Sequence, residues 1–326
     1  YMDQNPGYNY KLANNIDASE TASWNSGAGF SPVGNLSAPY TGTFDGQGHV
    51  ISGVMINRPS QDNVGLFGRN DHATIRSVGV SNVDVIGHDF VGGLIGSQGE
   101  EISISNSYVT GSVQGNSHVG GLIGLAYHTN ISDSYTDVDV TGNNRVGGFV
   151  GSVDGWGHTI TRSYSSGTVT GNDYVGGFVG LNNYNYTISN SFSTSAVTGA
   201  SHTGGFMGSN VSPDWGSMPA PVNSYFTDAA HNNGLGSLTT ESALTSSSHA
   251  VYSGWDFDAD GVSAGHNGVW IMAGLPHLQN EWTTTITNAA QLQMMALDLD
   301  ANYTLMNDID ASSTANWNGG KGFDPV

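Results

Sequence analysis

A six-residue phrase, Val-Gly-Gly-Leu-Ile-Gly at residues 91–96, constrains this chain most, because close copies of it recur at nearly constant spacing. Further copies begin at Val119, Val146, Val175 and Thr203, and a looser first copy begins at Val64. The six starting positions are separated by 27, 28, 27, 29 and 28 residues. Self-similarity at a fixed period of this length is the signature of stacked structural repeats.

Each interval between two copies holds a second phrase, Ile-x-x-Ser followed by Tyr or Phe. It reads Ile-Ser-Asn-Ser-Tyr at 104–108 and Ile-Ser-Asp-Ser-Tyr at 131–135, while the first copy has Val-Gly at 78–79 in place of Ser-Tyr. A glycine and a polar turn, such as Asn-Asn-Arg at 143–145, close the unit. Each unit therefore reads as strand, turn, strand, turn.

The recurring runs are short and rich in β-branched and aromatic residues, which favours strands over helices. A unit of about 28 residues is short for a propeller blade but suits one coil of a β-solenoid, in which three short strands and their turns complete a rung. We predict an all-β parallel β-helix (β-solenoid) with coils of about 28 residues. A short helix near residues 285–299, with Asn288 as its cap, is the one helical segment that we expect.

Equivalent residues of successive coils should stack at about 4.8 Å and form ladders. We expect one buried ladder at Leu66, Leu94, Leu122, Phe149, Phe178 and Phe206, and a second at Ile75, Ile104, Ile131, Ile160 and Ile188. The aromatic residues Tyr108, Tyr135, Tyr164 and Phe192 should stack on one another in the same way. The glycine pairs fit a tight corner, where a positive φ or a close backbone approach would exclude a side chain.

The composition is acidic, with 27 Asp plus Glu against 7 Lys plus Arg and a formal charge of −20. Such a chain gains nothing from phosphates, so nucleic acid and anionic membranes are excluded as expected partners. The absence of cysteine excludes disulfides and thiol chemistry and is compatible with a secreted bacterial protein. No apolar run approaches the roughly 18 residues of a membrane span, so we do not expect the chain to span a membrane.

A longer period relates the two ends of the sequence. Ile16 and Ile309, Trp24 and Trp317, and Val33 and Val326 are each 293 residues apart. We therefore expect a tandem array in the parent protein. The expected domains are residues 1–60 as the N-terminal start of the β-helix, 61–211 as regular coils, 212–280 as irregular coils and loops that close the unit, and 281–326 as the start of the next 293-residue unit.

The two phrases at this spacing resemble the GLUG-motif repeats of large secreted bacterial adhesins. The resemblance covers nearly the whole chain. It implies a right-handed parallel β-helix of the filamentous-haemagglutinin kind, exported to the bacterial cell surface or the extracellular space and used in adhesion or matrix building. It brings no catalytic residues with it, and its motifs specify the fold more closely than the ligand.

An Asp-x-Asp-x-Asp-Gly run, formed by Asp256, Asp258, Asp260 and Gly261, is the clearest candidate metal site. Alternate carboxylates that turn on a glycine are typical of calcium loops. The twelfth position is Asn267 in place of the Glu of an EF-hand, so only a calcium loop of another type could be meant. The alternative is a solvated acidic turn. Calcium is the only cofactor that we expect.

The residue before each glycine-rich phrase gives a candidate binding strip of aromatic and polar side chains along one edge of the solenoid. Such side chains could stack on sugar rings and bond to their hydroxyl groups. The alternative is a variable turn that faces solvent. We call these residues the strip: Phe90, His118, Arg145, Tyr174 and His202.

Catalysis is not expected. The nearest approach to a polysaccharide-cleaving site is Asp133 and Asp137 facing Arg162 about one coil away, and seven basic residues in all would stabilise an anionic transition state poorly. We predict a non-catalytic stalk of an adhesin, with a possible surface for a glycan or matrix. The expected partners are extracellular polysaccharide, a host or neighbouring cell surface, or copies of the chain itself. One alternative is a self-assembling extracellular filament or sheath, and a lesser one is a polysaccharide-active β-helix enzyme.

Overall fold

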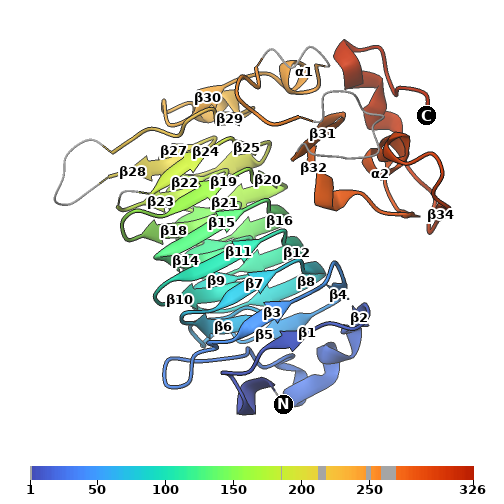
Figure 1. Ribbon diagram of the computed structural model, residues 1–326. Coiled ribbons are helices and arrows are strands. Elements are labelled where there is room, and N and C mark those ends of the chain that lie inside the picture. Colours follow the sequence, from blue (N-terminus) through green and yellow to red (C-terminus); the bar gives the residue numbers. More distant parts are fainter. Residues whose placement is uncertain (1, 185, 212–217, 247–250, 258–268) are drawn as a thin grey trace. The chain divides into compact units, whose positions relative to one another are not determined.

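The computed structural model describes residues 2–184, 186–211, 218–246, 251–257 and 269–326. They divide into two compact units, residues 1–238 and 239–326. The first unit is a parallel β-solenoid in which strands from successive coils lie side by side along one axis (Figure 1). The prediction of an all-β solenoid with coils of about 28 residues is therefore confirmed.

Four parallel sheets, here called A to D, run along the described part of the first unit. Sheet A contains β1 (Tyr10–Lys11), β3 (Thr43–Asp45), β7 (Thr74–Arg76), β11 (Ile102–Ser105), β15 (Thr129–Ser132), β19 (Thr159–Thr161) and β24 (Thr187–Ser189). Sheet B contains β2 (Ile16–Asp17), β4 (Val50–Ser52), β5 (Met55–Asn57), β8 (Gly79–Ile86), β12 (Tyr108–Gln114), β16 (Tyr135–Thr141), β20 (Tyr164–Ser166), β21 (Thr168–Thr170), β25 (Phe192–Ser193), β26 (Ala196–Thr198), β29 (Tyr225–Phe226) and β30 (Ser237–Leu238).

The other two sheets hold the glycine-rich phrases. Sheet C contains β6 (Phe67–Asn70), β10 (Ile95–Gln98), β14 (Ile123–Tyr127), β18 (Val150–Asp154), β23 (Val179–Asn182) and β28 (Met207–Asn210). Sheet D contains β9 (Asp89–Gly92), β13 (Ser117–Gly120), β17 (Asn144–Gly147), β22 (Asp173–Gly176) and β27 (Ser201–Gly204). Short 3-10 helices are η1 (Met2–Gln4), η2 (Ser19–Gly27) and η3 (Ala229–His231).

A regular coil therefore has four short strands, so the predicted three strands to a rung are wrong. Each phrase reads as one run in the sequence but is broken by a corner in the structure. The pair Gly92 and Gly93 ends β9 before β10 begins, and Asn106, with φ of 50°, separates β11 from β12. A continuous apolar run does not reveal a corner when glycine or a left-handed residue turns the backbone inside it.

The register is that of the predicted ladders. Ile131 pairs with Ile104 on one side and with Ile160 on the other. Phe149, Phe178 and Phe206 are fully buried, and their rings stack with centroids 4.6 and 4.9 Å apart. Tyr108, Tyr135, Tyr164 and Phe192 stack at 4.8, 4.9 and 4.9 Å. Repetition of one residue type along the axis thus fills the core with aligned, interdigitating side chains.

The glycine corners arise from close backbone approach. A Cβ on Gly120 would lie 2.1 Å from the carbonyl oxygen of Ile123 and 2.6 Å from the amide nitrogen of Gly151 in the next coil. Positive φ values occur instead at the residue before the phrase. There the strip residues Phe90, His118, Arg145, Tyr174 and His202 have φ of 59°, 54°, 56°, 52° and 43°.

The recurring serine of the second phrase has a structural role. The hydroxyl of Ser134 donates to the carbonyl of Ser132 at 2.7 Å and accepts from the amide of Ser107 in the preceding coil at 3.2 Å. Ser163 repeats both bonds with Thr161 and Ser134. This buried serine column satisfies backbone groups where the chain turns from sheet A to sheet B.

The second unit contains short elements. They are α1 (Glu241–Leu244), the antiparallel pair β31 (Trp270–Ala273) and β32 (Leu275–Leu278), η4 (Gln279–Glu281), β33 (Thr285–Ile286), α2 (Ala289–Met294), η5 (Met295–Leu297), β34 (Thr304–Leu305) and η6 (Ser312–Gly319). The helix expected near 285–299 is α2 continued by η5, and the Asn288 side chain caps it by accepting from the amide of Gln291 at 2.9 Å. The four-residue helix α1 was not predicted.

Candidate functional site

The strip lies on sheet D, where each of its residues is the second residue of a strand. Sheet pairing aligns the neighbouring positions, with Val119 opposite Val91 and Val146 opposite Val119. The left-handed backbone at each strip position interrupts the strand alternation just before a buried valine in four coils and before the half-buried Thr203 in the fifth. Each coil therefore contributes one strip side chain, and these side chains follow one another along the solenoid axis.

The strip residues contact one another along the solenoid. The rings of Phe90 and His118 stack at 4.6 Å, and those of Tyr174 and His202 at 4.5 Å with an interplanar angle of 8°. Between these pairs, Nη1 of Arg145 lies 2.7 Å from Nε2 of His118. His202 is exposed and the other four side chains are half-buried. The structure thus brings all five predicted residues into one row.

His118 is held in its neutral form. Burial, together with the positive charge of Arg145, lowers the pKa of His118 to about 4. A guanidinium group only donates, so Nε2 of His118 accepts from Arg145 and its hydrogen lies on Nδ1, which is 3.0 Å from Oγ of Ser117. The middle of the strip is a neutral imidazole beside a fixed cation.

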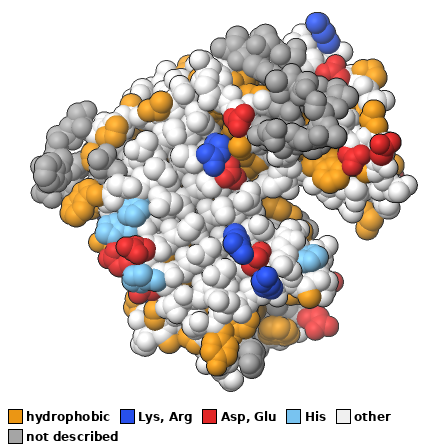
Figure 2. Space-filling view, viewed as in Figure 1, with side chains coloured by type: hydrophobic (Ala, Val, Ile, Leu, Met, Phe, Trp, Pro, Cys, Tyr) orange, Lys and Arg blue, Asp and Glu red, His pale blue; other side chains and the backbone are white. Residues whose placement is uncertain are grey.

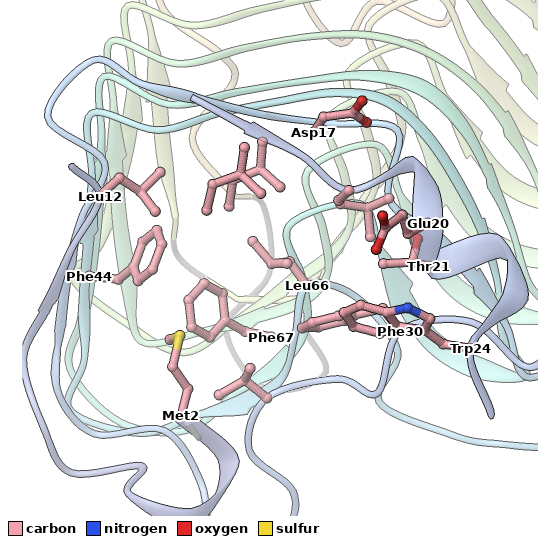
Figure 3. A pocket seen from close by; sticks show the side chains of 15 residues that line it. Met2, Leu12, Asp17, Glu20, Thr21, Trp24, Phe30, Phe44, Leu66 and Phe67 are labelled. Carbon is pink, nitrogen blue, oxygen red and sulfur yellow. The ribbon is translucent and has the colours of Figure 1, made fainter. Parts of the chain in front are cut away.

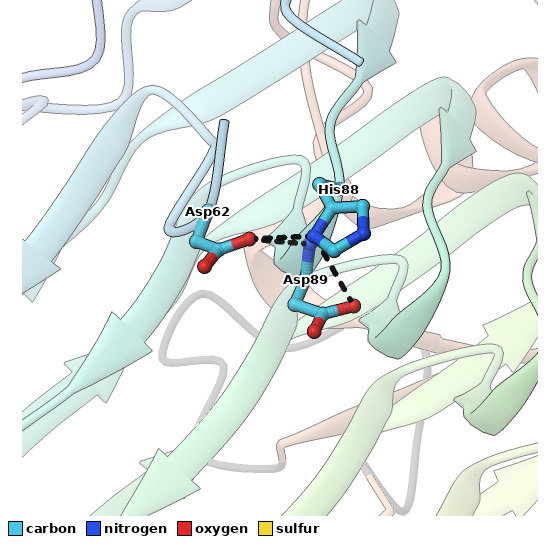
Figure 4. A group of neighbouring side chains, drawn as sticks. All are labelled: Asp62, His88 and Asp89. Carbon is cyan, nitrogen blue, oxygen red and sulfur yellow. Dashed lines mark hydrogen bonds and ion pairs between the residues drawn. The ribbon is translucent and has the colours of Figure 1, made fainter. Parts of the chain in front are cut away.

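A carboxylate and histidine group lies beside the N-terminal end of the strip (Figure 4). Nδ1 of His88 is 2.8 Å from Oδ1 of Asp62 and 3.7 Å from Oδ1 of Asp89. The hydrogen bond to Asp62 and the charge of Asp89 raise the pKa of His88. Among the described residues, these three form the group whose potential metal-ligand atoms lie within 4.8 Å of one another. They already pair with one another as an ion-pair cluster.

A row of amides and carboxylates continues from this cluster along the strip. Asn116 donates to Asp89 at 2.8 Å, and Asn172 donates to Asn143 at 2.6 Å. At the far end, Asp173 accepts from Oγ of Ser201 and pairs with Nδ1 of His202, each at 2.6 Å. Burial would raise the pKa of Asp173, but these hydrogen bonds outweigh it and hold the pKa low. Aromatic rings and hydrogen-bonding oxygens therefore run in parallel over five coils.

The strip ends at its N-terminal side in a hollow of about 340 Å³. Gly34, Asn35 and Leu36 line one side of it, and residues 61–63 line the other. Asn63 has φ of 59° and occupies the strip position of the looser first coil. Asp62 belongs both to this hollow and to the ion-pair cluster, so the two features adjoin.

Sequence reasoning missed a second surface group, here called the loop cluster, where the chain passes from sheet C to sheet A. It consists of Tyr127, His128, Trp156, His158 and Tyr184. The rings of Tyr127 and His128 stack at 4.2 Å, those of His128 and His158 at 5.0 Å, and Trp156 meets Tyr184 edge-on at 5.5 Å. Figure 2 shows histidine and acidic side chains gathered on this edge of the first unit.

Trp156 is the most exposed member of the loop cluster, with 57% of its surface accessible. It stands between Gly155 and Gly157, whose φ values are 104° and 77°. These loops fall outside the two recurring phrases, so their residues did not appear as ladders. The sequence signal that could have found the cluster is a tryptophan between two glycines.

The predicted calcium run is only partly described. Asp256 is exposed, and its carbonyl oxygen accepts from the amides of Val269 and Trp270 at 2.9 and 3.0 Å. Asp258 and Asp260 lie outside the described residues, as does the loop between them and Val269. The calcium site therefore remains a prediction.

The acidic and basic residues considered for catalysis serve as a ladder instead. Asp133 accepts from Nε and Nη2 of Arg162 at 2.6 and 2.8 Å. Asp137 is opposite Ser166, whose hydroxyl donates to it at 2.9 Å. The expectation that both carboxylates face Arg162 is wrong for Asp137, because it lies on strand β16, whose register places it opposite Ser166.

The family model of the GLUG motif matches residues 91–114 and 115–141, which are two consecutive coils; Phe90 immediately precedes them and His118 lies within the second. These two coils are GLUG-motif repeats. The matched residues contribute β10 and β14 to sheet C, β11 and β15 to sheet A, β12 and β16 to sheet B, and β13 to sheet D.

Two similar proteins place the GLUG coils in context. The chain is 36% identical over 130 residues to halomucin of Haloquadratum walsbyi, a match that covers 37% of this chain and 1% of halomucin. The chain thus spans a very small part of that relative. A crystal structure from Bacteroides ovatus, of a protein provisionally described as an immunoglobulin A1 protease, has a TM-score of 0.57 and 21% identity. The structural match covers 83% of this chain and 86% of the Bacteroides ovatus chain. At this level of identity the match is evidence for the fold alone.

None of the helices among the described residues has the length and apolar character that a bilayer crossing would need.

Proposed function

We propose that this chain is a non-catalytic GLUG-repeat segment of a secreted cell-surface protein, acting as a stalk that binds extracellular polysaccharide along the strip. The observation that carries the proposal is the row of stacked rings on successive coils, bordered by carboxylates and amides. Pyranose rings bind through apolar faces against aromatic rings and through hydroxyl groups that bond to such oxygens. A repeating site suits a repeating polymer.

Two further observations support an extracellular setting. The similarity to halomucin, by its name a mucin, favours a protein that works among extracellular polymers. The chain also has no cysteine and a formal charge of −20, which suits a soluble surface and repels other anionic polymers. The expected ligand is therefore a neutral or cationic polysaccharide.

The test is co-sedimentation of the chain with insoluble polysaccharides, such as cellulose, chitin and a neutral mannan. The double substitution of Phe90→Ala and Tyr174→Ala should weaken binding at least tenfold, because it removes both aromatic faces of the strip. Tyr8→Ala is the matched control, since Tyr8 is an exposed aromatic residue outside the strip and the loop cluster. Equal loss in the control, or no loss in the double variant, would reject the strip as the binding surface.

The loop cluster is a second candidate surface for the same ligand class. Trp156 is exposed on a turn next to Tyr184, an arrangement that could stack on a sugar. Trp156→Ala separates the two surfaces in the co-sedimentation assay. If Trp156→Ala abolishes binding while the strip variant retains it, the ligand lies on the loop cluster.

A self-assembling filament is the alternative function. Open solenoid ends present unpaired backbone groups that can add further strands. Electron microscopy of the purified chain distinguishes the two functions. Discrete particles that co-sediment with a polysaccharide support the adhesin, and long fibres that bind none of the polysaccharides support the filament.

Peptide hydrolysis, suggested by the description of the Bacteroides ovatus protein, is not favoured. A serine protease needs a histidine that accepts from serine and donates to a carboxylate. In the strip, Ser117 and His118 are paired, but the other imidazole nitrogen meets Arg145 and the low pKa makes His118 a weak base. Ser201 donates to Asp173 and not to His202.

A further inference from the structure

The N-terminal end of the solenoid has an apolar hollow, with buried side chains such as Phe67 and partly exposed ones such as Met2, Phe30 and Trp24. Figure 3 shows Phe44, Leu66 and Phe67 at the floor of a hollow, with Met2 and Phe30 at its rim. The hollow has a volume of about 220 Å³. Beside it, Trp24 has 46% of its surface exposed. Exposed apolar surface gathered in one place usually marks a site that another segment covers.

The second unit contains a second copy of this face. Both 3-10 helices of the face recur 293 residues later: η1 (Met2–Gln4) as η5 (Met295–Leu297), and η2 (Ser19–Gly27) as η6 (Ser312–Gly319). The copies share their backbone in detail. Trp24 and Trp317 have φ and ψ of −73° and 154° against −72° and 158°.

Side-chain contacts recur as well. Tyr10 donates to the carbonyl of Asn5 at 3.0 Å, and Tyr303 donates to that of Asp298 at 2.7 Å. The rings of Trp24 and Phe30 lie 6.5 Å apart, and those of Trp317 and Phe323 lie 6.3 Å apart. Residues 295–326 therefore reproduce the face formed by residues 2–33.

In the second unit the copied face is covered. Trp317 is only 8% exposed, although its backbone and its aromatic partner match those of Trp24. The cover comes from described residues of the segment that precedes it in the chain, residues 239–246, 251–257 and 269–294. Residues 239–294 are here called the joint segment. At the turn between β31 and β32, Gly274 lies against the Trp317 ring so closely that a Cβ would be 2.3 Å from Cε2.

Hydrogen bonds fix the joint segment to the copied face. The carbonyl of Thr245, just after α1, accepts from the amide of Asn318 at 3.1 Å. On α2, Gln293 donates to the carbonyl of Asp324 at 3.0 Å and accepts from its amide at 2.9 Å. The equivalent positions in the first copy, Asn25 and Ser31, are exposed.

We propose that the N-terminal face of the solenoid is the docking surface for a copy of the joint segment, supplied by a repeat unit ahead of it on the same polypeptide. Because equivalent residues are 293 apart, Met294 at the end of the joint segment corresponds to position 1 of the next copy. The segment that would dock on this face contains an apolar β-hairpin (β31 and β32) with Gly274 at its turn, and the two short helices α1 and α2. This inference rests on the 293-residue repeat and is independent of glycan binding.

The test joins residues 239–293 directly ahead of Tyr1 in the full chain and measures tryptophan oxidation by hydroxyl radicals with mass spectrometry. In the unextended chain, Trp24 should react several-fold faster than Trp317. In the extended chain, Trp24 should slow to the rate of Trp317. An unchanged Trp24 rate in the extended chain overturns the proposal.

A matched control carries Gly274→Ala in the added copy only. The new methyl group would collide with the indole, so this copy should leave Trp24 as reactive as in the unextended chain. The same substitution at the original position should raise the rate of Trp317 and so checks the contact where it is seen. If Trp24 in the unextended chain is protected as protein concentration rises, a second molecule covers the face and the proposal is wrong.

Discussion

At the scale of single residues, the left-handed backbone at the strip positions separates surface chemistry from the core. Val91 and its equivalents are buried, while the preceding residue changes from Phe to His, Arg and Tyr. A left-handed conformation costs about 1 kcal/mol for most residues and more for β-branched ones. The side chain there can vary widely provided that it is not β-branched or proline.

The pKa values of His118 and His88 should be shifted in opposite directions from the usual histidine value. NMR titration should give His118 a pKa of about 4 and His88 one above the usual value of about 6.5. Between about pH 6.5 and pH 4 the unfolded chain binds a proton that folded His118 does not, so this residue lowers stability as the pH falls. His88 does the reverse, since its pairing stabilises the fold at low pH and is lost as the pH rises through its raised pKa.

Urea unfolding at a series of pH values checks the sign for His118. His118→Gln removes the titrating group, so the stability advantage of the wild type over this variant should shrink as the pH falls from about 7 to about 4. Asp62→Asn should return the pKa of His88 toward its usual value and leave His118 unchanged. A His118 that titrates near pH 6.5 would mean that the Arg145 contact does not persist in solution.

At the scale of elements, the glycine corners decide whether a coil can close. Gly120→Ala places a methyl group against backbone atoms of its own coil and the next one, and we expect a loss of about 3 kcal/mol in the free energy of unfolding. Gly157→Ala meets no atom within 4 Å and should cost about 1 kcal/mol, through its φ of 77° alone. Denaturation in urea measures both. Similar losses would mean that backbone conformation, and not crowding, demands glycine at the corner.

Calcium should stabilise the folded chain if the Asp256 run binds it. Millimolar calcium is then expected to raise the melting temperature of the chain, and a chelator should reverse the rise. Asp256→Asn should abolish the effect, because it removes one of the alternating carboxylates. Asp62→Asn is the control, since it alters the other carboxylate group and should leave the response intact. The same melting temperature with calcium and with chelator would leave a solvated turn as the better reading.

The sequence predicted the ladders and the glycine corner but not the number of strands in a coil. Ile104, Ile131 and Ile160 were found because a period of about 28 residues aligns like with like, and the core depends on that alignment. The four-strand coil was missed because the corner between β11 and β12 is turned by the left-handed Asn106 and has no glycine to mark it. Trp156 was missed because its loop has no equivalent residue in other coils.

The exposure of two equivalent residues can also differ because of distant segments that the local sequence does not reveal. Trp24 and Trp317 are each followed by Asn and have nearly the same φ and ψ, yet one is exposed and the other buried. The difference comes from the joint segment, which precedes Trp317 in the chain. Sequence comparison found the repeat but gave no means of knowing which copy would be covered.

At the scale of the whole molecule, stability comes from contacts between neighbouring coils, so the first unit should tolerate the loss of one coil. Deletion of residues 119–145 joins His118 to Val146 and restores the glycine-rich phrase in register. We expect a folded chain with a cooperative unfolding transition. Deletion of residues 119–132 removes half a coil and should prevent folding. Circular dichroism and urea unfolding distinguish the outcomes, and a folded half-coil deletion would refute strict register.

The equal length of the coils has a consequence for heredity. Copying errors in repetitive DNA tend to add or remove whole repeats, and here one repeat encodes one rung. Each such error would lengthen or shorten the solenoid by about 4.8 Å and leave every buried ladder intact. The length of this solenoid could therefore be adjusted between generations in small steps of one coil, without a change of fold.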